Sequence, residues 1–145
     1  MIDTKDKEIL KEYAKDSRQS YREIARKIGI SPSTVAARVA KMEENEIIKK
    51  YTIQVDSEKL GYDLTVLMFI DTQAFRFLRD NLPLEDYLIN AMYVMTGEDD
   101  LIIIAKFKNR QELATFTQKM LESPSVKGTK TQLVLMTKIE DFNKI

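Results

Sequence analysis

The residues of this 145-residue chain that are best suited to bind another molecule gather between positions 18 and 41. Six basic residues and one acidic residue lie in that stretch, although the whole chain has a formal net charge of zero. A local basic patch in a neutral chain is the electrostatic footprint expected for a polyanion. The alternative is an ordinary solvated helix face, because exposed lysines and arginines are common on protein surfaces.

A helix-turn-helix pattern organises this basic stretch. Ser20 and Glu23 form a capping-box signature, which predicts a short helix over 20–28 that ends at Gly29. Ser31 followed by Pro32 predicts the start of a third helix, which should run to about Asn45. Apolar spacing predicts a first helix over 3–15. Two helices joined by a three-residue turn containing Gly are typical of the DNA-binding motif.

The third helix would then enter the major groove of double-stranded DNA. Its serine, threonine and arginine side chains suit base edges and phosphates, and Ala37 suits a thymine methyl group. The amides at the two helix starts suit phosphate oxygens, and the second helix should cross the DNA backbone. The candidate DNA-binding residues are Ser20, Arg22, Arg26, Ser31, Ser33, Thr34, Ala37, Arg38 and Lys41. The alternative is a three-helix domain that contacts proteins.

The rest of the chain predicts a second, α+β domain. Tyr51, Ile53 and Val55 alternate with polar residues, which is typical of a strand. After a linker, the order is strand, helix, strand, strand, helix, strand, as in a ferredoxin-like βαββαβ fold. We expect strands at 64–70, 91–95, 101–107 and within 126–138 (centred on 133–136), and helices at 74–82 and 110–122. The predicted domains are therefore 1–50, a hinge strand and linker at 51–61, and 62–145.

The predicted sheet should have two apolar faces. The strands at 64–70 and 101–105 are nearly continuous apolar runs, whereas a sheet with one solvated face alternates apolar and polar residues. Two helices, the second with Leu113, Phe116, Thr117, Met120 and Leu121 on its apolar side, cover only one face. The same sheet of a second copy is the expected cover for the other, which predicts a homodimer. Loops or the first domain are the alternative cover.

Composition excludes several classes of chemistry. The chain has no Cys and no His, which excludes disulfides, thiolate chemistry, imidazole catalysis and most zinc sites. No metal or other cofactor is predicted. No apolar run approaches the ~20 residues of a membrane helix, and the first residues do not resemble a signal peptide. We therefore expect a cytoplasmic protein without a membrane segment.

Six short motifs follow one another along the chain. They are Asp3-x-x-Asp6-x-x-Ile9-Leu10, Tyr21-x-x-Ile24-Ala25, Ile30-Ser31-x-Ser33-Thr34-Val35-x-x-Arg38-Val39, Ile48-x-x-Tyr51, Thr96-Gly97-x-x-Asp100-Leu101 and Val126-x-x-Thr129-x-Thr131-x-Leu133-Val134-Leu135. Together, in this order and at these separations, they resemble one known family, the leucine- and asparagine-responsive transcription regulators (Lrp/AsnC, or feast/famine, family). The resemblance extends over essentially the whole chain.

The resemblance implies DNA binding by dimers that assemble into tetramers, octamers or longer arrays. It also implies an amino acid or related metabolite bound between effector domains, near the turn at 97–100. The implied effector-binding residues are Gly97, Glu98, Asp99, Asp100, Thr129 and Thr131. On turn chemistry alone, Gly97 to Asp100 is equally compatible with a simple hairpin turn.

The chain departs from the family pattern at several positions. Glu46 and Lys50 stand where the family usually has Gly, so Asn45 is expected to supply the left-handed end of the third helix. Gly128 stands where a basic residue is common. The turn at 98–100 carries three consecutive carboxylates, which would repel a free carboxylate ligand. The effector is therefore basic, or there is none.

Three alternatives to an effector-controlled regulator follow from the same residues. One is an architectural DNA-binding protein without an effector, and another is a metabolite sensor that acts through protein partners alone. The third is an enzyme, since siroheme decarboxylases share the two-domain architecture; those enzymes are thought to depend on His, which this chain lacks. Glu98 and Asp99 are adjacent on a tight turn, a poor arrangement for an acid–base pair, so we expect no enzymatic activity.

Overall fold

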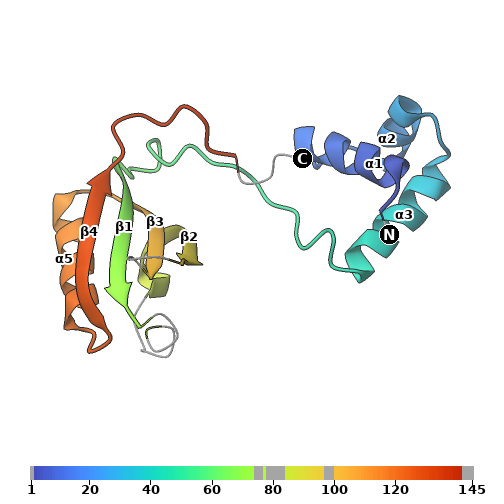
Figure 1. The fold of residues 1–145 in the computed structure, drawn as a ribbon. Helices are drawn as coiled ribbons and strands as arrows, with labels where there is room; N and C mark the ends of the chain where they lie inside the picture. The colour runs from blue at the N-terminus through green and yellow to red at the C-terminus, as the bar shows by residue number, and fades with distance from the viewer. Residues whose placement is uncertain (1, 74–76, 78–83, 97–99, 142–145) are drawn as a thin grey trace. The chain divides into compact units, whose positions relative to one another are not determined.

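The computed structural model describes the chain except for residues 1, 74–76, 78–83, 97–99 and 142–145. It divides into two compact units. The first consists of residues 1–54 together with the segment that begins at Ile139, and the second consists of 55–138. Each unit has its own cluster of buried apolar side chains, so each is described separately (Figure 1).

The first unit contains three helices, and local side chains define where they begin. They are α1 (Thr4–Lys15), α2 (Tyr21–Ile28) and α3 (Pro32–Glu44). Asp3, Ser20 and Ser31 cap the three N-termini, and the predicted capping box of Ser20 with Glu23 is confirmed. Gly29 follows α2 with a φ of 70°, the left-handed conformation expected of a Gly at this position.

The buried stripes of the three helices meet in one apolar cluster. Ile24 from α2 and Val35 and Val39 from α3 are fully buried there, as is Ile9 from α1. The spacing of these residues along each helix follows the 3.6-residue period of an amphipathic helix. The cluster orients α2 and α3 as a helix-turn-helix, with the opposite side of α3 exposed.

The end of α3 differs from the expectation for Asn45. Asn45 has a φ of −89°, and Glu46 takes the left-handed conformation instead, with a φ of 54°. The N–H of Ile47 donates to the carbonyl of Met42 over 2.8 Å, and the N–H of Glu46 donates to that of Glu43 over 3.0 Å. This is the Schellman arrangement, which requires the left-handed residue one position after the helix cap. Asn45 stays right-handed and its side chain donates to the carbonyl of Lys41 over 2.6 Å.

The predicted strand at 51–55 is wrong, because this segment pairs with no strand in the described chain. Tyr51 still belongs to the first unit, since its hydroxyl donates to Glu43 over 2.8 Å and its ring meets Tyr13 edge-on at 5.6 Å. Beyond it, Ile53 is 81% exposed. Alternating apolar and polar residues suit a segment to a strand, but a strand also needs a neighbouring strand with which to form hydrogen bonds.

The second unit is a four-stranded antiparallel sheet, as predicted. Its strands are β1 (Leu64–Thr72), β2 (Leu88–Val94), β3 (Leu101–Phe107) and β4 (Val126–Leu133), in the order β2-β3-β1-β4. Helix α5 (Arg110–Glu122) connects β3 to β4, and a 3-10 turn, η1 (Leu84–Asp86), precedes β2. The helix predicted at 74–82 falls almost entirely outside the described residues. The strand order is that of the ferredoxin-like fold.

Two strand boundaries differ from the predictions. Strand β2 begins at Leu88 rather than Ala91. Strand β4 ends at Leu133, so the expected centre of the last strand, 133–136, lies at and beyond its end. The pairing register explains this, because Leu133 is opposite Val66 and β1 begins only two residues before Val66. Leu135, with no strand to pair with, is 98% exposed.

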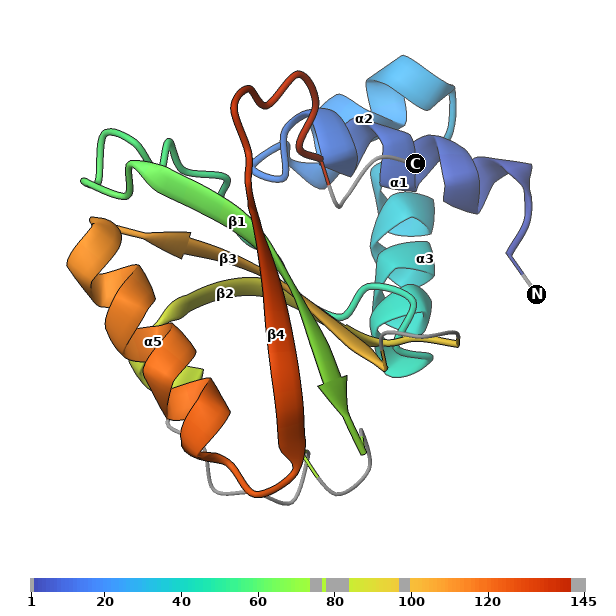
Figure 2. The ribbon, with the colours of Figure 1, turned by 60° about the vertical axis from the view of Figure 1, so that its left-hand side comes forward.

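The two faces of the sheet differ in what covers them. Alternate residues of β1 (Val66, Met68 and Ile70) are fully buried on the side of α5 (Figure 2). Phe116 and Met120 of α5 are buried against them, whereas Leu121, predicted on the same apolar side, is 52% exposed. The intervening residues of the sheet point to the other face, which no described helix of this unit covers.

That second face is apolar at its centre. Leu67 lies opposite Ile104 and Phe69 lies opposite Ile102 across the β1–β3 ladder, and all four side chains are half-buried. Tyr93 of β2 extends the surface, since it lies beside Ile102 and is 49% exposed. The expectation of two apolar sheet faces is therefore met, and side chains on both faces explain why the strands do not alternate in the sequence.

We predict that Glu46→Gly stabilises the first unit by about 1 kcal/mol, because a non-Gly residue in the left-handed region carries a steric cost of roughly that size. Asn45→Gly is the matched control: its φ is negative, and the substitution removes the bond to Lys41, so it should destabilise. Urea denaturation followed by circular dichroism measures both. A Glu46→Gly variant no more stable than the parent would contradict the account of this helix end.

Candidate DNA-binding surface and effector turn

The exposed side of α3 begins with a cluster of hydroxyl groups. The Ser31 hydroxyl lies 2.9 Å from that of Ser33 and 2.7 Å from that of Thr34, and it accepts the Thr34 N–H over 3.1 Å. All three side chains are exposed at the start of the predicted recognition helix. Ala37 and Lys41 continue the same exposed side, opposite the buried Val35, Val39 and Met42. This surface offers hydroxyls, one small apolar residue and one cation.

Arg38 lies at the edge of this surface, on the flank of α3 that faces α1. Its Nη1 donates to Asp3 Oδ2 over 2.7 Å and to Asp6 Oδ1 over 2.8 Å. The Arg38 side chain is 31% exposed and that of Asp6 only 14%. The N–H of Asp6, followed by the Arg38 guanidinium, holds the pKa of the Asp3 carboxyl below its ordinary value. The structure thus separates Arg38 from the other predicted contacts of α3.

Helix α2 presents two arginines beside the recognition helix. Arg22 and Arg26 are exposed, and no ion pair involves them in the part of the chain that the structure describes. Ser20, at the start of α2, is occupied by its capping box, in which its hydroxyl also donates to Glu23 over 2.8 Å. Its contribution to an anion site is therefore through the helix start rather than through its hydroxyl.

Other cations of the basic stretch are engaged inside the first unit. Lys27 bonds to Glu12 at 2.9 Å and also to Gln19, and Lys15 lies 2.5 Å from the same Glu12. These two ammonium groups, Lys15 first, lower the pKa of Glu12 to about 2. Arg18 lies 3.5 Å from Asp16. The cations of the predicted surface that remain available to phosphates are Arg22, Arg26 and Lys41.

Asp100 is the one predicted effector-turn residue within the described chain, since Gly97, Glu98 and Asp99 lie outside it. Its carbonyl accepts the N–H of Met95 over 2.8 Å, which closes the turn between β2 and β3. Its carboxylate accepts the N–H of Thr72 over 3.3 Å, which links the turn to the end of β1. Asp100 therefore has a structural task in the free protein, as the hairpin-turn alternative requires.

Thr129 lies at the same end of the sheet as Asp100. Ile70 of β1 pairs with Leu101 on one side and with Thr129 on the other. Leu101 follows Asp100 directly, so Asp100 and Thr129 are separated by two strand spacings. Two strand spacings correspond to about 10 Å. Thr131 lies two pairs further along, opposite Met68. The fold brings the described candidates to one end of the sheet, but they do not touch within one chain.

Two hydroxyl residues at this end were not singled out from the sequence. The Thr72 hydroxyl donates to the carbonyl of Ser125 over 2.6 Å, and both residues are buried. The Ser125 hydroxyl is itself buried and has no hydrogen-bond partner. Ser125 follows the Ser-Pro pair that ends α5, which signals only a turn. Its proximity to the effector end arises from the crossover connection.

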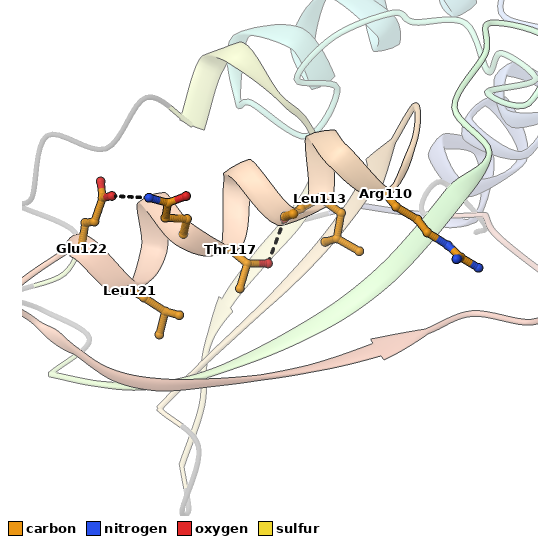
Figure 3. Close-up of a pocket in the computed structure, with 7 residues that line it drawn as sticks. Arg110, Leu113, Thr117, Leu121 and Glu122 are labelled. Carbon is orange, nitrogen blue, oxygen red and sulfur yellow. Dashed lines mark hydrogen bonds between the residues drawn. The ribbon is translucent and has the colours of Figure 1, made fainter.

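A shallow hollow on α5 belongs to neither predicted site (Figure 3). Leu113, Thr117 and Leu121 lie along it at four-residue intervals, between Arg110 at one end and Glu122 at the other. The Thr117 hydroxyl donates to the carbonyl of Leu113 over 2.9 Å, so it does not offer its proton to a ligand. The exposed Leu121 is one of its lining residues.

Among the described residues, no group of three or more carboxylate, His or Cys side chains is placed to hold a metal ion. No helix in that part of the chain is long and apolar enough to cross a membrane.

Comparison with known proteins connects this geometry to relatives. Residues 2–49 match a family model described as winged helix-turn-helix DNA-binding, and residues 88–143 match the Lrp/AsnC ligand binding domain. An uncharacterised HTH-type transcriptional regulator of Pyrococcus abyssi is 38% identical over 98% of this chain and 97% of its own length. The structure of AsnC from E. coli superimposes with a TM-score of 0.84 at 27% identity, covering 97% of each chain.

A third comparison is with a transcriptional regulator of Neisseria meningitidis, solved as a complex with L-Met. It has a TM-score of 0.90 at 18% identity, over 100% of this chain and 97% of that one. At this identity the similarity concerns the fold.

Proposed function

This chain belongs to the Lrp/AsnC family of DNA-binding transcription regulators, a family of regulators rather than enzymes, and from this premise we propose how it binds DNA and what controls it. The proposed domains are a DNA-binding domain at 1–50, a connecting segment at 51–61, and an effector-binding and oligomerisation domain at 62–145. We propose that it acts in the cytoplasm.

The observation that carries the DNA-binding proposal is the set of available cations around an exposed α3. Arg22, Arg26 and Lys41 form no ion pair within the described chain, whereas Arg18 and Lys27 do. Phosphate contacts position a protein on DNA, and hydroxyl side chains in the groove supply base contacts. We assign phosphate contacts to the three cations and to the helix starts at Ser20 and Ser31. Base-edge contacts fall to Ser33, Thr34 and Ala37.

Few groups on this surface discriminate between base pairs strongly. Ala36, Ala37 and Ala40 offer no hydrogen bond, and no Asn or Gln lies on α3. Sequence preference should therefore come in large part from the shape and deformability of the DNA. The regulator would prefer certain sequences rather than recognise one operator exclusively.

We predict that Arg22→Ala, Arg26→Ala and Lys41→Ala each weaken DNA binding about equally for all sequences. Each should reduce the slope of log affinity against log salt by about 0.9 per DNA-bound domain, because each loses one phosphate contact. Lys59→Ala, an 84% exposed lysine of the second unit, is the control and should leave the slope unchanged. Fluorescence anisotropy with a labelled duplex over a series of salt concentrations measures the slope. Unchanged slopes in all three variants would refute the assigned surface.

We propose a homodimer formed by the uncovered sheet face. Leu67, Phe69, Ile102 and Ile104 form a continuous apolar surface that no described helix of the second unit covers. A second copy of this face would bury it, with the two sheets stacked about 10 Å apart. Dimers of this kind can then associate further into tetramers or octamers.

We predict that Phe69→Glu converts the dimer to a monomer, because it places a charge at the centre of the apolar face. Thr115→Glu, on the exposed side of α5, introduces the same charge away from that face and should leave the dimer intact. Light scattering after size exclusion gives the mass. A monomeric parent protein, or a Phe69→Glu variant that remains dimeric, would contradict the sheet-to-sheet dimer.

We propose that an amino acid acts as effector at the end of the sheet that carries Asp100. The regulator of Neisseria meningitidis is described as a complex with L-Met, which supports an amino acid as the ligand class. In this chain, Asp100 and Thr129 lie at the same sheet end but on strands of the two flanks, so a neighbouring chain must complete a site. The three carboxylates at 98–100 favour a basic amino acid over a neutral one.

We predict that one amino acid, with lysine and arginine tested first, shifts the protein from dimers to a larger assembly. Light scattering of DNA-free protein with each standard amino acid in turn measures the shift. Thr129→Val should abolish the response while the dimer remains, because it removes one hydroxyl and keeps the side-chain shape. A mass unchanged by every amino acid would instead support the second candidate, an architectural DNA-binding protein without this effector.

A further inference from the structure

The carboxylates of Asp3 and Asp6 form a closed network in which every oxygen already has a donor. Asp3 Oδ1 accepts the Asp6 N–H over 2.9 Å, and Asp6 Oδ2 accepts the Asp3 N–H over 3.0 Å, which is the capping box of α1. The two remaining oxygens both accept Arg38 Nη1, over 2.7 and 2.8 Å. The side chains of Asp3 and Asp6 therefore both cap the start of α1 and bind Arg38 of α3.

We propose that Asp3 and Asp6 withhold Arg38 from DNA, so that Arg38 is a positioning residue of the recognition helix rather than a DNA ligand. The inference builds on the DNA-binding function proposed above. It removes Arg38 from the list of phosphate and base contacts and assigns it a different task. That task is to fix the start of α1 against the flank of α3.

The charge balance of this flank supports the proposal. Two carboxylates surround one guanidinium, so the cluster carries a net negative charge, and a DNA phosphate brought to Arg38 would also meet Asp3 and Asp6. Moving Arg38 to a phosphate would leave the carboxylate of Asp6, which is 14% exposed, without its cation. Breaking a partly buried pair in this way carries the desolvation penalty of the group that is left behind.

The position of Arg38 on α3 points the same way. Ser33, Thr34, Ala37 and Lys41 are exposed on the side away from the core, whereas Arg38 is half-buried beside α1. The negative flank formed with Asp3 and Asp6 would be repelled by the DNA backbone. It therefore favours an orientation of α3 in which Ser33, Ala37 and Lys41 approach the DNA more closely than the neighbouring flank with Arg38 does.

The opposing interpretation is that the two carboxylates present Arg38 to DNA. Within the described chain only Nη1 is bound, so the N–H groups of Nη2 and Nε are free to bond to a phosphate. The two interpretations predict opposite effects of removing the carboxylates. If the carboxylates withhold Arg38, removing them lets Arg38 make a new DNA contact. If they present Arg38 to DNA, removing them takes away the groups that orient it, and DNA binding weakens.

Four proteins separate the two interpretations: the parent, Arg38→Gln, the double variant Asp3→Asn with Asp6→Asn, and the triple variant that combines them. Asn is as good a helix N-cap as Asp, and an amide oxygen can still accept each capping N–H, so α1 should remain capped. The amide nitrogens, however, are donors and cannot accept Arg38. The double variant therefore releases Arg38 without removing the helix start.

The measurement is DNA affinity by fluorescence anisotropy between about 50 and 200 mM salt, the range over which phosphate contacts show clearly. We expect the parent and Arg38→Gln to have the same salt slope. The double variant should gain about 0.9 in slope per DNA-bound domain, so its affinity falls roughly 3.5-fold more than that of the parent across this range. The triple variant should return to the slope of the parent, since it contains no arginine to release.

Thermal melting by circular dichroism accompanies the binding data. Arg38→Gln should melt at a lower temperature than the parent, because it leaves two carboxylates without their cation. If Arg38→Gln does not fold, the salt slope of the triple variant alone distinguishes the two interpretations, because that variant leaves no charge of this cluster unpaired. A triple-variant slope equal to that of the parent supports the proposal, and a slope lower by about 0.9 overturns it.

A loss of about 0.9 in the slope of Arg38→Gln, with no gain in the double variant, would likewise overturn the inference and make Arg38 a DNA ligand. That result leaves the proposed DNA-binding function intact. Failure of the parent protein to bind any duplex is a different result, which would defeat the proposed function and this inference together.

Discussion

Strand β1 forms two antiparallel ladders, one with β3 and one with β4, and the rest of the second unit depends on this double pairing. The ladders hold Asp100 and Thr129 at one end of the sheet. They also turn Val66, Met68 and Ile70 toward α5 and Leu67 and Phe69 toward the opposite face. Because both sets are apolar, the same strand that builds the core also builds the surface proposed for the second copy.

In the first unit, hydrogen bonds at helix ends serve both stability and function. Ser20 and Ser31 satisfy free N–H groups at two helix starts, and we propose that DNA phosphates approach the same two places. Ion pairs meanwhile engage Lys27, Arg18 and Arg38 within the unit. What is left for DNA is a smaller set of cations than the sequence contains. The charge that the surface offers is therefore set by internal pairing rather than by composition.

The parts of the fold that could be predicted depend on contacts between near neighbours in the chain. Ser20 and Glu23 are three residues apart, as are Ser31 and Thr34, so the helix starts could be identified from sequence. The segment at 51–55 has the same alternation as a paired strand, yet no strand among the described residues pairs with it. The end of β4 could not be predicted from the sequence either, because it depends on where β1 begins, more than sixty residues earlier in the chain.

The candidate site divides in the same way. The sequence by itself determined the helix-turn-helix, its caps, the ferredoxin-like order and the basic stretch, because periodicity and capping act within a turn or two of the chain. Only the tertiary structure decided which cations are available. Asp3 and Arg38 are 35 residues apart, and they meet because the apolar stripes of α1 and α3 pack into one cluster. A charge is engaged or available according to its neighbours in space, and those neighbours are set by packing.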